Sequence, residues 1–204
     1  MVEDRTIQLA QLALAHGQVR WILAQLGLRV GDSEPQFDAW LKYVRRVGVP
    51  FYPNELGRGA GVNVTYRFHH VMELAVALAL RTQGILPRDL LGLLAQQRHV
   101  LRPLYHQAYR EHDRGLGALL QLRFAEAGRG LVVQGTFLDL QLDYLEGGVL
   151  TLAAPRLLGP EDAVRRFVRQ DSLRHPRPPL PLSQLACDVL RLAEGAPELR
   201  RGRA

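Results

Sequence analysis

The stretch TYRFHHVMELAVALALRTQGILPRDLLGLL, residues 65–94, decides our expectation of the fold. Its apolar residues recur at helical spacing over His69–Gln83, and the run stops at Gly84, as is typical of a helix that buries one face and ends at a glycine. Pro87 suits the first turn of a new helix, which would bury the leucines that follow. The stretch therefore predicts two consecutive helices with a short connection.

Two further helices are expected before this stretch. The Leu- and Ala-rich segment from Thr6 to Leu28 has helical spacing, with a break suspected at His16-Gly17. A second helix is predicted over Phe37–Val47, because Ser33 and Pro35 are start signals and Gly48 is an end signal. Its apolar residues share an inner face: Phe37, Trp40, Leu41 and Val44. Its outer face is basic: Lys42, Arg45 and Arg46.

Between these helices lies a glycine-rich loop, Gly57–Gly61, with Arg58 between two of its glycines. A nucleotide phosphate loop ends in Gly-Lys-Ser/Thr, whereas this loop continues into Val62. The dinucleotide fingerprint fails too, because its third glycine would fall at that valine. We interpret the loop as the tip of a β-wing, with Pro50–Tyr52 and Val62–Val64 as its extended arms and Arg58 at its end.

The net charge of +6 is unevenly distributed. Residues 40–110 hold ten basic and three acidic side chains, whereas residues 1–39 are net negative and residues 111–204 are nearly balanced. All basic residues except Lys42 are arginines, which suit bidentate contacts to phosphate. A basic segment of this kind is expected of a protein that binds a polyanion. The alternative is a solvated surface that happens to be rich in arginine.

These features resemble the DNA-binding half of the mercury-resistance-regulator (MerR) type of transcription regulators. Tyr66-Arg67-Phe68 matches the element that leads from the wing into the third helix of that family, and Leu80-Arg81-Thr82-Gln83-Gly84-Ile85 matches the passage to the fourth helix. The resemblance covers about residues 36–97. It implies DNA contacts from Tyr43, Arg45 and Arg46 on the recognition helix, from Arg58 on the wing, and from Tyr66 and Arg67 to a phosphate beside it. Lys42, on the same outward face, is a further candidate contact.

The second half of the chain is expected to start with one long helix, His99–Ala127, because its apolar seam alternates three- and four-residue steps. By the resemblance, this helix would be the dimerisation helix. Alternating apolar and polar residues over 138–144 predict a half-buried strand, and Glu146–Gly148 predicts a turn into a returning strand, Val149–Ala153. Short helices are expected after Gly159 and from Ser183.

Other chemistries have weaker support in the sequence. His69 and His70 are adjacent, so on a helix they should point about 100° apart, which does not favour a metal pair. Asp139 and Asp143 share one face of the predicted strand and could form a catalytic pair or a cation site, although the polar side of a hairpin explains them equally well. The single cysteine, Cys187, excludes an intramolecular disulfide and fits a reducing compartment.

Taken together, the sequence predicts a mainly α (α+β) protein. A winged helix-turn-helix domain would occupy residues 1–98, a long linker or dimerisation helix residues 99–127, and a small α+β part residues 128–204. The expected function is that of a cytoplasmic, bacterial-type regulator, not an enzyme, that binds double-stranded DNA as a homodimer and needs no cofactor, metal or membrane. Its C-terminal part could bind a small-molecule or protein effector. Two alternatives stay open: a winged-helix adaptor that binds no DNA, and a small ligand sensor or enzyme that uses Asp139 and Asp143.

Overall fold

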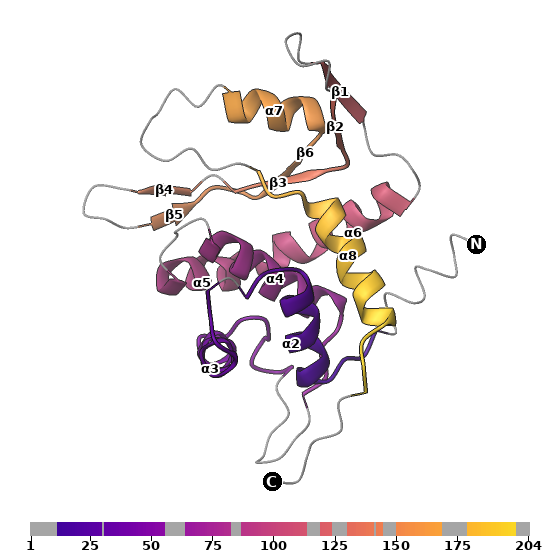
Figure 1. Ribbon diagram of the computed structural model, residues 1–204. Coiled ribbons are helices and arrows are strands. Elements are labelled where there is room, and N and C mark those ends of the chain that lie inside the picture. The colour runs from indigo at the N-terminus through magenta and orange to yellow at the C-terminus, as the bar shows by residue number, and fades with distance from the viewer. Residues whose placement is uncertain are drawn as a thin grey trace. The chain divides into compact units, whose positions relative to one another are not determined.

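The computed structural model describes residues 12–29, 31–55, 64–82, 87–113, 119–123, 130–140, 142–144, 150–168 and 179–198 (Figure 1). Tertiary contacts divide the chain into two compact units. One comprises Met1–Gln96 with Asp188–Ala204, and the other comprises Gln97–Cys187. The described residues are mainly helical with small antiparallel sheets. This confirms the predicted mainly α class with a minor β component.

The helices α2 (His16–Gln25), α3 (Glu34–Arg46), α4 (Phe68–Thr82) and α5 (Pro87–Gln96) belong to the first unit. Figure 1 views α3 along its axis while α2 runs in the plane of the picture, so these two helices cross. All four lie within segments that were predicted to be helical, or extend them by a few residues. Residues 6–11 of the first predicted helix lie outside the described residues. The prediction is wrong for residues 12–15, which are not helical, because Leu14 forms an antiparallel bridge with Tyr66.

Local signals set both ends of α3. Ser33 precedes the helix, and its backbone N–H donates to Gln36 Oε1 at 2.9 Å, which is one arm of a capping box. At the other end Gly48 has a φ of +94°, a left-handed conformation that glycine adopts without steric cost. The predicted start and stop signals are therefore confirmed.

The core of the first unit surrounds α4. This helix is buried on almost all sides rather than on one face, as expected of a helix that is apolar all round. The inner residues of the crossing pair pack in the same core: Val19, Ile22 and Leu23 from α2, and Phe37, Leu41 and Val44 from α3. Each such side chain contributes about 1.5–3 kcal/mol on burial. The inward face of α3 is thus buried in the core of the first unit.

The second unit corrects the predicted helix over His99–Ala127. Only its first part is helical, as α6 (Arg98–Asp113), and a strand follows, β1 (Leu119–Arg123). This strand pairs antiparallel with β2 (Gly130–Gln134), with Leu119 opposite Gln134. The leucines of β1 fit helical spacing as well as the alternation of a strand, and pairing with the valines of β2 favours the strand. A single continuous dimerisation helix over these residues is therefore wrong.

The predicted strand over residues 138–144 divides between two sheets. Its start is β3 (Phe137–Asp139), which pairs antiparallel with β6 (Arg156–Leu158) and also forms a bridge from Leu138 to Leu180. Its end is β4 (Leu142–Tyr144), which pairs with β5 (Leu150–Leu152). The hairpin between β4 and β5 is confirmed, and its turn lies outside the described residues. The register of β3 places Asp139 opposite Arg156.

Two further helices follow the strands. The helix α7 (Pro160–Val168) lies against β1, β3 and β6, and α8 (Leu182–Glu194) begins with buried Leu182 and Ser183. Ser183 Oγ accepts a hydrogen bond from the Thr136 N–H at 2.9 Å. Both helices were predicted and are confirmed. The start of α8 is thereby joined to the residues that lead into β3.

Candidate nucleic-acid interface

The outward face of α3 is basic, as the sequence predicts. Lys42 and Arg46 are exposed, and Tyr43 and Arg45 are half-buried. The Arg46 guanidinium carbon lies 5.6 Å from the centroid of the Tyr43 ring, within the range of a cation–π contact. Of the seven predicted DNA contacts, Lys42 and Arg46 therefore lie on the exposed side of α3. Tyr43 and Arg45 flank its buried face, and the Nε atom of Arg45 is itself buried.

These cations lack acidic partners. Among the described residues, neither Lys42, Arg45 nor Arg46 forms an ion pair with a carboxylate. Arginines elsewhere in the described structure do so repeatedly: Arg20, Arg29, Arg81, Arg156, Arg165, Arg166 and Arg191. The outward end of α3 is thus a local excess of positive charge.

Tyr66 does not have its predicted role. Its predicted partner is a phosphate, but its side chain is 0% exposed, so in this structure no ligand reaches it. Its backbone pairs with Leu14 through hydrogen bonds of 2.8 and 2.9 Å, and its ring packs edge-on against Phe51 at 5.0 Å. This correction has a physical cause: the ring fills the core below the start of α2, a contact between segments far apart in the sequence.

The Tyr66 hydroxyl contacts His16, which is not among the predicted DNA contacts. His16 Nδ1 lies 3.1 Å from the Tyr66 hydroxyl oxygen. Burial lowers the pKa of His16, and the neighbouring charge of Arg45 lowers it further, whereas Asp38 opposes the shift. Only a suspected helix break pointed to His16, because its functional neighbours come from α3 and from the entry to α4. The structure thus adds an ionisable group to the basic face.

The wing can be followed only in part. Arg58 and residues 56–63 lie outside the described residues, so the predicted wing tip stays a prediction. After these residues the chain is described again from Val64, and Tyr66 pairs with Leu14 rather than with Pro50–Tyr52. Arg67 is exposed next to it, as a phosphate contact requires.

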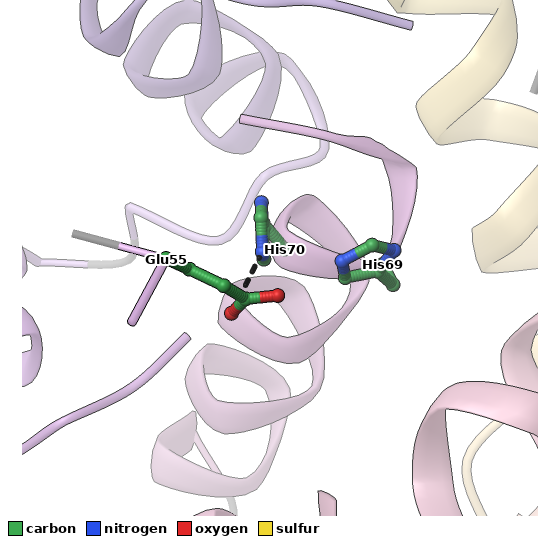
Figure 2. A group of neighbouring side chains, drawn as sticks. All are labelled: Glu55, His69 and His70. Carbon is green, nitrogen blue, oxygen red and sulfur yellow. Dashed lines mark hydrogen bonds and ion pairs between the residues drawn. The ribbon is translucent and has the colours of Figure 1, made fainter. Parts of the chain in front are cut away.

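Figure 2 shows Glu55, His69 and His70 gathered at the start of α4, with ligand atoms that lie within 4.8 Å of one another. The expectation that the two histidines diverge is wrong, because their ring centroids are 4.2 Å apart. His70 Nδ1 accepts a hydrogen bond from the Arg67 N–H at 3.0 Å. This bond orients the His70 ring toward the backbone just before the first turn of α4.

The hydrogen bonds of His70 decide what this cluster does. Because Nδ1 accepts this hydrogen bond, the neutral ring has its own proton on Nε2, which lies 3.4 Å from Glu55 Oε2. The same oxygen accepts from the Tyr52 N–H at 2.8 Å. A metal ligand needs an unprotonated nitrogen, so this arrangement fits a helix cap that holds the turn at Tyr52–Glu55 better than it fits a metal centre.

The two carboxylates proposed for a sensor or enzyme do not share the one strand face that the sequence predicts for them. Asp139 lies in β3 and Asp143 in β4, two strands of different sheets. Asp139 is buried and lies 3.0 Å from Arg156 and 3.6 Å from Arg166. Its charge is therefore neutralised within the fold. The side chain of Asp143 lies outside the described residues.

Comparison with protein-family models, curated proteins and solved structures gives no match to this chain. Within the described residues no helix is both long and apolar enough to cross a membrane.

Proposed function

We propose that this protein binds double-stranded DNA as a sequence-specific transcription regulator. The observation that supports this most is the outer face of α3, where Lys42, Arg45 and Arg46 have no acidic partner among the described residues and the opposite face is committed to the core. A polyanion is the ligand class that such a surface favours.

In this proposal α3 enters the major groove, and the cations around it contact the phosphates. Arginine forms bidentate contacts to guanine or phosphate, so Arg45 and Arg46 are the preferred groove or phosphate contacts. Arg67 and, from the predicted wing, Arg58 add phosphate contacts beside the groove. Each neutralised phosphate releases counterions, so affinity falls steeply with salt, by about 0.9 in the logarithmic slope per contact.

The homodimer and the effector belong to the proposal through the resemblance to the MerR type. A dimer of winged helices would bind two half-sites related by a two-fold axis. Since the predicted helix over 99–127 ends at Asp113, α6 is the remaining helical candidate for this contact. The second unit, with its small sheets, is the candidate for binding an effector.

The proposal is tested with a charge-matched pair of triple variants. The test variant is K42A/R45A/R46A. The control, R110A/R165A/R191A, removes the same number of positive charges from other helices, where Arg110, Arg165 and Arg191 are exposed. Fragments bound by the wild-type chain are first selected from genomic DNA, and binding to one labelled fragment is then measured by fluorescence anisotropy at several salt concentrations.

We expect the test variant to lose affinity about 100-fold or more at 0.1 M salt, with a shallower salt dependence, while the control loses less than about tenfold. Equal losses in both variants would show that only net charge matters and would contradict a specific interface on α3. If the wild-type chain selects no DNA at all, the adaptor that binds no DNA becomes the better proposal. Footprinting of a selected fragment tests the dimer, because two symmetric half-sites are expected.

A further inference from the structure

The start of α2 and the outer face of α3 meet at His16. His16 is the first residue of α2 and is half-buried. Four charged side chains act on its imidazole: Arg45, Asp38, Arg20 and Lys42. Asp38 is the single acid among them, and it lies 3.1 Å from Arg20 in an ion pair. The surroundings of His16 are therefore positive overall, with Arg45 and Lys42 left unbalanced.

The hydroxyl of Tyr66 sets the state of the His16 ring. Burial raises the pKa of Tyr66, and the nearby charge of Arg45 only partly offsets this, so the phenol keeps its proton at neutral pH. The cation beside the phenol oxygen favours a hydroxyl that donates its proton to His16 Nδ1, 3.1 Å away. The neutral imidazole then has its own proton on Nε2 and presents a hydrogen-bond donor.

A second proton on this imidazole is unfavourable in the unbound protein. It would add a positive charge beside Arg45 and Lys42, in a place where burial already disfavours charge. A phosphate on the same face reverses the balance, because it supplies the negative charge that the cluster lacks. Tyr66 does not obstruct this change, since its hydroxyl oxygen can accept a hydrogen bond from Nδ1–H as well as donate one to Nδ1.

We propose that His16 is a phosphate contact of the basic face, together with Lys42 and Arg45, and that phosphate binding there is coupled to the uptake of one proton by His16. This rests on the proposed binding of DNA and adds a regulation to it: acidification strengthens the complex. The linkage of one proton limits the effect to about tenfold in affinity per pH unit.

Two measurements test the coupling. In the first, anisotropy with a selected duplex at pH 5.5, 6.5 and 7.5 compares the wild-type chain with the variants His16→Gln and His99→Gln. Glutamine keeps a side-chain oxygen that can accept from the Tyr66 hydroxyl but does not titrate. His99 is exposed on α6 of the second unit, so its replacement removes an imidazole that does not belong to the proposed site. In the second, NMR follows the His16 Cε1–H signal against pH alone, with the duplex, and with inorganic pyrophosphate.

We expect the wild-type chain and His99→Gln to gain affinity at least threefold more than His16→Gln between pH 7.5 and 5.5, within the limit of about tenfold per pH unit. The NMR titration of His16 should move to higher pH with either ligand. Equal pH dependence in all three proteins, with an unmoved titration, would overturn the coupling and leave DNA binding intact. If pyrophosphate moves the titration but no duplex binds, the anion site stands and the DNA function falls. If neither ligand binds, both are refuted.

Discussion

Arginine side chains gather at two places in this molecule with opposite results. In the second unit Arg156 and Arg166 lie beside Asp139, a buried carboxylate. On α3 of the first unit Lys42, Arg45 and Arg46 find no carboxylate among the described residues. The first arrangement uses its charges to hold strands and a helix together. The second has no acidic partner among the described residues and, by our proposal, binds DNA, so the two clusters should respond differently to the same kind of mutation.

The largest expected effect on stability concerns Gly135, which lies shortly before the strand that carries Asp139. A Cβ at position 135 would lie 2.1 Å from Ser183 Oγ, and Gly135 has a φ of +95°. The substitution Gly135→Ala therefore displaces Ser183 and strains the backbone just before β3. We expect it to lower the free energy of unfolding by more than about 3 kcal/mol, measured by urea denaturation with far-UV circular dichroism.

Gly159→Ala is the control in the same unit, because a Cβ there meets no atom within 4 Å. Its expected loss is less than about 1 kcal/mol. Both tryptophans, Trp21 and Trp40, lie in the first unit, so their fluorescence should shift less than the circular dichroism signal in the Gly135→Ala variant. An unchanged dichroism midpoint for that variant would refute the packing of Ser183 against Gly135.

The next largest loss of stability is expected when Asp139, the acid that Arg156 and Arg166 share, is replaced. Asp139→Asn leaves Arg156 and Arg166 facing each other without their counter-charge. Removing one partner of a buried pair costs several kcal/mol, but the two arginine side chains are 55% and 38% exposed, so we expect a loss of about 2 kcal/mol. The double variant Asp139→Asn/Arg156→Gln should recover part of it. If Asp139→Asn is as stable as the wild-type chain in urea, the cluster does not hold the fold.

Local patterns explain which elements were predictable. The bounds of α3 follow from Ser33, Pro35 and Gly48, whose effects act within one turn of the helix. The strand β1 was missed because a leucine run satisfies helical spacing as well, and only its pairing with β2 decides between them. The outward cations of α3 were predictable from the same helical spacing. His16 and the burial of Tyr66 were not, because their contact joins residues 50 positions apart.

A smaller effect is expected for an ion pair inside the first unit. Arg81 donates to both oxygens of Asp32, at 2.6 and 3.1 Å, and lies 5.3 Å above the Trp40 ring. These hydrogen bonds lower the pKa of Asp32. The variant Arg81→Ala should therefore lose about 1–2 kcal/mol of stability at neutral pH, measured by tryptophan fluorescence in urea.

The pH dependence of this loss follows from the direction of the shift. A carboxyl whose pKa is lowered by folding contributes stability above its unfolded pKa, near 3.8 for Asp32, and this contribution is lost as the pH falls through the folded value. The wild-type chain and Arg81→Ala should therefore converge as the pH is lowered below about 4. Arg29→Ala is the control, because its pair with Glu34 is exposed and worth little. A gap that stays constant down to pH 2.5 would contradict the ion pair.

The smallest effect on stability is expected for the cations on the outer face of α3. Here the contrast with the Asp139 cluster should be greatest. Lys42 is exposed and has no ion pair within the described structure, so Lys42→Ala should change the free energy of unfolding by less than about 0.5 kcal/mol. If Lys42 contacts one phosphate, the same variant should reduce the logarithmic salt slope of DNA binding by about 0.9. Arg165→Ala, which breaks an exposed pair with Glu161, should leave that slope unchanged. A Lys42→Ala variant with lowered stability and an unaltered slope would place Lys42 among the charges that serve the fold, as Asp139 does.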